Sequence, residues 1–170
     1  MSTLAVKAAR TVTSPEKSQA EIQRILRRYG ATGYQFSHDH EQATASVSFR
    51  VPDAPKSTQM VPVYLPVSVL TVANRLYGTR RDRASQFYGK QWEQAERVAW
   101  RHLVLWIDAA LTAATMGLQT ITEAFFAHAV VGALNGRPER MIEYVEREQS
   151  LLANGVRALL TAPADMEIEA

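Results

Sequence analysis

The sequence contains no cysteine. This absence excludes disulfide bonds, thiol catalysis and zinc sites built on cysteine, and it is compatible with a reducing cytoplasm. No apolar run reaches the roughly 20 residues that a helix needs to cross a bilayer. The first ten residues also lack the apolar stretch and cleavage site of a secretion signal. We therefore expect a cytoplasmic protein that makes no contact with a membrane.

The sequence also lacks the motifs of common nucleotide-binding and hydrolytic sites. It has no Gly-x-Ser-x-Gly and no Gly-x-Gly-x-x-Gly, and the loop that begins at Gly78 lacks the Gly-Lys-Ser/Thr of a phosphate loop. His38 and His40 form the most metal-like cluster, but no further ligands follow at a useful spacing, which favours a polar turn. Asp108 has no identifiable catalytic partner. We expect no enzyme, no metal and no cofactor.

Charge is distributed unevenly in a chain of ordinary globular composition. The 170 residues are 46% hydrophobic and 21% charged, which fits one domain with a short appendage. Up to Arg101 there are 15 lysines and arginines against 8 acidic residues, whereas from His102 onward there are 4 against 9. A basic half can attract a polyanion, or it can pair with the acidic half within one molecule or between subunits. The sequence leaves both interpretations open.

The first hundred residues predict a helix followed by strands. Residues 1–13 show no periodicity and are expected to form a flexible arm. Ser14 can cap a helix that Pro15 opens, and Gly30 supplies its end. Alternating polar and apolar residues predict an antiparallel hairpin over 34–51. A third strand is expected over 59–65, and it should lie at a sheet edge because Pro62 cannot donate to a ladder.

The remainder predicts helices. Apolar spacing favours a short helix over 66–77 and a long, alanine-rich helix over 91–116. A capping box predicts a second helix over 120–134, and Pro138 is expected to open a third that ends near 162. Residues 163–170 form an acidic tail.

These elements predict an α+β fold. It comprises an N-terminal helix, a three-stranded antiparallel sheet, a long helix packed on the sheet and a C-terminal helical pair. We expect residues 14–134 to form the α+β domain and residues 135–162 to add a C-terminal helix that packs on it or extends it.

Basic side chains gather in two segments of this domain. Arginines lie mostly off the apolar stripe of the first helix, and a basic loop with interleaved aromatic residues precedes the long helix. Cations can bind phosphates while aromatic rings stack on the bases of a single strand. A solvated helix face and aromatics that dock the loop on the core are the structural alternatives. The predicted nucleic-acid contacts are Arg24, Arg27, Arg28, Arg80, Arg81, Arg83, Tyr88 and Lys90.

Several short motifs resemble an uncharacterised family of small phage and prophage proteins. The motifs are Arg28-Tyr29-Gly30-Ala31, Leu65-Pro66, the run from Trp100 to Ile107, Gly117-Leu118-Gln119-Thr120 and Phe126-Ala127-His128. The resemblance covers about residues 14–131 and implies a phage context without a known activity. Asp108 and Ala110 stand where lysine is expected in such relatives. The order of elements is also similar to that of ring-forming single-strand annealing proteins, an analogy of topology only.

Together these patterns predict a non-enzymatic phage or prophage protein that binds single-stranded DNA as a homo-oligomer in recombination or replication. The alternative is a protein–protein interaction module, such as an inhibitor of a host or defence protein. Its contact surface would be the acidic face formed by Glu139, Glu143, Glu146 and Glu148.

Overall fold

The computed structural model describes residues 6–39, 41–54, 57–78 and 89–150, and it confirms the α+β class. Its helices and strands follow in the order α1 (Pro15–Arg28), β1 (Gly33–Asp39), β2 (Thr44–Pro52), β3 (Met60–Ser68), α2 (Val69–Tyr77), α3 (Lys90–Thr115), α4 (Ile121–Phe125), the 3-10 turn η2 (Phe126–His128), β4 (Val130–Leu134) and β5 (Arg137–Arg140). Residues 141–150 are again helical.

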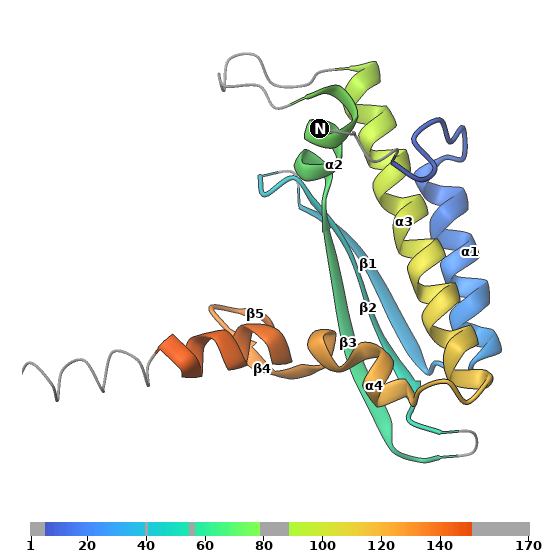
Figure 1. The fold of residues 1–170 in the computed structure, drawn as a ribbon, viewed down its shortest axis with the longest axis vertical. Coiled ribbons are helices and arrows are strands. Elements are labelled where there is room, and N and C mark those ends of the chain that lie inside the picture. The colour runs from blue at the N-terminus through green and yellow to red at the C-terminus, as the bar shows by residue number, and fades with distance from the viewer. Residues whose placement is uncertain (1–5, 40, 55–56, 79–88, 151–170) are drawn as a thin grey trace, which may run out of the picture.

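A three-stranded antiparallel sheet and two helices form the body of the protein. The strand order is β1-β2-β3, and α1 and α3 run side by side over one face of the sheet (Figure 1). Alternate residues of the strands point toward these helices, so the core consists of one face of the sheet and one stripe of each helix. Its largest fully buried side chains include Ile22, Leu26, Val47, Leu65, Trp100 and Ile107.

Helix α1 follows the sequence prediction closely. The Ser14 side chain caps it by accepting from the Lys17 amide at 3.4 Å, and Pro15 occupies the first turn. Ile22 and Leu26 are fully buried, as their spacing predicts. Gly30 follows the end of the helix and has a φ of +79°, a conformation that residues with a side chain rarely adopt.

Strand β3 lies at a sheet edge, which confirms the inference from Pro62. It is longer than predicted, because residues 66–68 continue the ladder with β2 and do not begin a helix. Helix α2 starts only after Ser68, whose side chain accepts from the Thr71 amide at 3.1 Å. A cap of this kind fixes the start of a helix more strongly than an apolar stripe does.

Helix α3 spans 26 residues, which corresponds to about 39 Å. Its bounds agree with the predicted 91–116 to within one residue. Trp100 is buried and meets Phe36 of β1 edge-on, with the ring centroids 5.9 Å apart. No helix among residues 6–39, 41–54, 57–78 and 89–150 is both long and apolar enough to cross a membrane.

A two-stranded sheet interrupts the predicted C-terminal helical pair. The capping box of Thr120 and Glu123 is present, but α4 ends at Phe125 and the chain then forms the β4–β5 hairpin. Asn135 and Gly136 both have positive φ, as the central residues of a type I′ hairpin turn require. Ala129 also makes an antiparallel bridge to Val63 of β3, which draws the chain into an extended conformation.

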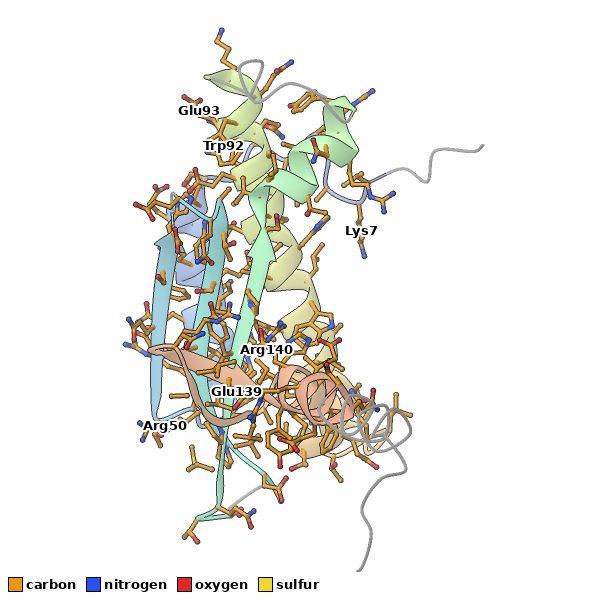
Figure 2. The ribbon with its side chains drawn as sticks, turned by 90° about the vertical axis from the view of Figure 1, so that its left-hand side faces the viewer. Lys7, Arg50, Trp92, Glu93, Glu139 and Arg140 are labelled. Carbon is orange, nitrogen blue, oxygen red and sulfur yellow. The ribbon has the colours of Figure 1, made fainter. Side chains whose placement is uncertain are left out.

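The hairpin lies on the side of the sheet opposite α1 and α3. Figure 2 shows Glu139 and Arg140 in front of the strands, and Figure 1 shows the hairpin and residues 141–150 projecting from the body. The helix predicted over 138–162 begins only at residue 141, because Arg137–Arg140 pairs with β4 as strand β5. Residues 151–162 and the acidic tail, 163–170, lie outside the described residues.

Residues 6–13, which belong to the expected arm, lie against α3. The Gln94 side chain donates to the carbonyl oxygens of Ala9 and Thr11, both at 3.0 Å. The carbonyl oxygen of Lys7 lies 2.7 Å from His102 Nε2. Residues 1–5 lie outside the described part of the chain.

Candidate nucleic-acid interface

The exposed side of α1 carries four cations. Lys17, Arg24, Arg27 and Arg28 are exposed, on the side of the helix opposite the buried stripe, and we call them the basic face. Arg24 and Arg28 are one turn apart, so their side chains leave the helix as neighbours. Arg27 donates to the hydroxyl of Tyr34 at 3.4 Å, which connects the face to strand β1.

Three of these four cations have no partner within the part of the chain that the structure describes. The side chains of Lys17, Arg24 and Arg28 make no hydrogen bond and no ion pair there. Glu21, an acidic residue of α1 that lies one turn before Arg24, is directed instead toward α3, where it pairs with Arg101. The positive charge of the basic face is therefore available to a ligand.

The acidic second half of the chain does not neutralise the basic face among the described residues. Glu139 pairs with Arg147 at 3.0 Å, and Glu143 pairs with Arg140 at 3.1 Å. These ion pairs form within the hairpin and the helical segment that follows it. Among residues 6–39, 41–54, 57–78 and 89–150, α1 therefore makes no ion pair with the acidic half of the chain.

The same ion pairs involve most of the glutamates of the predicted acidic contact surface. Glu139 is buried, and Glu148 lies 3.7 Å from Arg147. Burial alone would raise the pKa of Glu143, but hydrogen bonds from Arg140 and the nearby arginine charges lower the pKa overall. Of the four glutamates, only Glu146 is both exposed and without an ion pair among the described residues.

The structure separates Lys90 from the arginines of α1. Arg101 lies level with Glu21, and Lys90 precedes Arg101 by 11 residues, or about 16 Å of helix. Arg24 and Arg28 lie beyond Glu21 in the opposite direction, because α1 and α3 run parallel. Lys90 is exposed but belongs to the other end of the helical layer. Arg80, Arg81, Arg83 and Tyr88 lie outside the described residues.

The candidate metal and catalytic residues do not form a common site among the residues that the structure describes. His38 points from β1 toward α3, and its Nδ1 lies 3.0 Å from Glu96 Oε1. His40 lies outside the described residues. Within the described ranges no group of three or more potential ligands could hold a metal ion, and the carboxylate of half-buried Asp108 has no hydrogen bond or ion pair.

A cavity at the end of α1 was missed by the sequence analysis. It measures about 890 Å³ and includes Arg28 of the basic face among its lining residues. The rest of its wall comes from the end of α3, the start of α4 and the turn that follows β2, which meet at one end of the molecule (Figure 1). Three segments that are far apart in sequence form it, 28–30, 52–54 and 114–123, so no local pattern could have indicated it.

A second missed feature joins the hairpin to the body. Trp106 of α3 meets the ring of Phe125 at 5.3 Å and that of His128 at 5.2 Å, both edge-on. Arg140 Nη1 lies 3.4 Å from His128 Nδ1. Burial lowers the pKa of His128, and the charge of Arg140 lowers it further. This cluster connects Arg140 of the hairpin, through His128, to Trp106 of α3.

Comparison with known proteins gives no further indication of function. No protein-family model matches the chain, and neither curated proteins nor solved structures include a match.

Proposed function

We propose that this chain is a non-enzymatic nucleic-acid-binding protein whose basic face on α1 contacts the phosphates of single-stranded DNA. The observation that supports the proposal is that the side chains of Lys17, Arg24 and Arg28 lie on one exposed helix face and have no partner among the residues that the structure describes. Cations without carboxylate partners can replace the counterions that surround a polyanion, and the release of those counterions drives binding.

The number of cations sets the expected dependence on salt. Each phosphate contact to a single strand contributes about −0.7 to the slope of log affinity against log salt concentration. Four contacts from the basic face would give a slope of about −3. Further contacts from the predicted residues outside the described ranges would make the slope steeper.

The test is a titration of the full chain with a fluorescently labelled, mixed-sequence single strand over a series of salt concentrations. The double variant Arg24→Glu with Arg28→Glu should weaken binding strongly and flatten the slope by about 1.4 or more. The control is the double variant Arg10→Glu with Arg75→Glu, which makes the same charge change outside α1 at two exposed arginines that have no ion pair within the described part of the chain. Absence of binding at low salt, or equal loss in both double variants, would refute the proposal.

The phage context of the proposal comes from the sequence resemblance, whereas recombination and assembly into a homo-oligomer come from the topological analogy with ring-forming single-strand annealing proteins. Size-exclusion chromatography of the full chain, with and without a short oligonucleotide, tests the assembly. An elution volume of a monomer under both conditions would contradict it.

One observation favours the alternative, a module that binds a host protein. Val131, Ile142 and Tyr144 are exposed on the projecting hairpin and the helical segment after it. Apolar side chains of this kind are more suitable for a protein contact than the paired glutamates beside them. Copurification with one host protein that survives nuclease treatment would support this alternative over DNA binding.

A further inference from the structure

We infer that the cavity at the end of α1 receives one unpaired base of the strand whose phosphates lie on the basic face. This inference rests on the proposed function and names the ligand of the adjoining cavity: a nucleotide of single-stranded DNA, with its phosphate at Arg28 and its base inside.

Arg28 connects the two sites. It belongs to the basic face, one turn after Arg24, and it also lines the cavity together with its neighbour Tyr29. A phosphate held by Arg28 therefore places the attached sugar and base at the cavity entrance. The cavity is continuous with the only described helix face on which several cations stand without acidic partners.

The size and lining of the cavity fit an aromatic ring. A volume of about 890 Å³ lies within the range of small-molecule sites. Tyr29, Leu118 and Ile121 supply apolar surface, and Leu118 is 79% exposed although it is a large apolar residue. Stacking of a base on a tyrosine ring, or contact with exposed aliphatic surface, would remove this area from water.

The polar groups of the wall oppose a second phosphate and favour a base. Asp53 Oδ1 accepts from the Thr122 hydroxyl at 2.5 Å, which leaves its other oxygen without a partner in the described structure. The amide of half-buried Gln119 also has no hydrogen bond there. A carboxylate repels phosphate but accepts a hydrogen bond from the amino group of cytosine, and an amide can pair with adenine. The wall therefore favours bases that carry an exocyclic amino group.

This geometry also predicts a preference for single strands. In a duplex the Watson–Crick edges are paired and the bases are stacked, so a base must leave the helix before it can enter a cavity. An unpaired strand does not have this cost. A cavity that takes one base accordingly favours single-stranded over double-stranded DNA. A row of cations alone binds the phosphates of both and discriminates much less.

The experiment compares three labelled ligands of equal length on the full chain: oligo-dC, oligo-dT and a strand of abasic sites. One stacked base contributes about 1 kcal/mol or more, so oligo-dC should bind the native chain at least about fivefold more tightly than the abasic strand. Oligo-dT should bind less tightly than oligo-dC. The abasic strand carries the same phosphates and measures the basic face alone.

A pair of neighbouring variants makes the test specific. Leu118→Ser removes an exposed apolar wall of the cavity, whereas Met116→Ser removes a similar side chain that is 72% exposed and does not line it. Leu118→Ser should reduce the advantage of oligo-dC and leave binding of the abasic strand unchanged, and Met116→Ser should change neither. Equal binding of all three ligands by the native chain would overturn the cavity inference while the proposed function stands. No binding of any strand would overturn both.

Discussion

The substitution Phe125→Ala tests whether the segment after α3 folds as the structure shows, with α4 docked on the sheet, or as the continuous helix that the sequence predicted. Phe125 is 0% exposed, and its ring meets those of Phe49 at 5.4 Å and Trp106 at 5.3 Å, both edge-on. It therefore connects α4 to the sheet and to α3, and it supports the α4 end of the cavity.

The expected cost of Phe125→Ala follows from these contacts. Replacement of a buried phenylalanine by alanine costs about 3–5 kcal/mol, and the two lost aromatic pairs place this site toward the upper end. A domain of this size has a free energy of unfolding of roughly 5–15 kcal/mol, so the variant loses a large fraction of it. The melting temperature should fall by about 6–20 °C.

Phe126→Ala is the matched control, because the next residue is the same amino acid and is 53% exposed. It should change the free energy of unfolding by less than about 0.5 kcal/mol. Urea denaturation followed by circular dichroism measures both variants. If Phe125→Ala costs less than about 1 kcal/mol, or if the two variants cost the same, α4 does not dock as described and the cavity loses one wall.

Three further predictions concern contacts that join the elements. Glu21→Gln breaks the pair with Arg101, whose side chains are 29% and 25% exposed, and should lower the free energy of unfolding by about 1 kcal/mol in urea denaturation. His128 has a lowered pKa in the folded chain, so the unfolded chain binds more protons below about pH 6.5. The free energy of unfolding should therefore decrease as the pH falls below this value. The substitution His128→Gln should remove this part of the pH dependence of the melting temperature. Gly136→Ala has open space around it but a φ of +79°, so strain alone should cost about 1 kcal/mol, visible as faster hydrogen exchange in β4 and β5.

The first half of the fold could be predicted because its patterns are unambiguous. The cap and the apolar stripe at Ile22 and Leu26 fit only a helix. The strict alternation of polar and apolar residues over 44–51 fits only a strand. The segment after α4 has no such pattern. Val130 and Leu134 fit one face of a helix as well as a strand, and the deciding contact, the bridge of Ala129 to Val63, is tertiary. Asn135-Gly136 was the local signal that should have outweighed the apolar spacing.

The candidate site divides in the same way. Exposure of Arg24, Arg27 and Arg28 follows from helical periodicity, so the sequence predicted the basic face. Whether an acidic residue neutralises it depends on which glutamates fold against which arginines. By sequence alone Glu21 could pair with Arg24 on the surface of α1. It does not, because it lies opposite Arg101 of α3 and pairs with that residue. The cavity depends on the meeting of three separate segments of the chain and has no counterpart in the sequence pattern.

Helix stability alone does not explain why these four cations share one face. Arg27 and Arg28 occupy the last turn of α1, where a positive charge interacts favourably with the helix dipole by about 0.3–1 kcal/mol. Lys17 lies in the first turn, where the same dipole disfavours it, and Arg24 faces the like charge of Arg28 one turn away. Both cations therefore cost stability at their positions, and neither recovers it through an ion pair among the described residues. Water and salt screen these costs only in part, and a polyanion bound along this face, as we propose, would offset both of them.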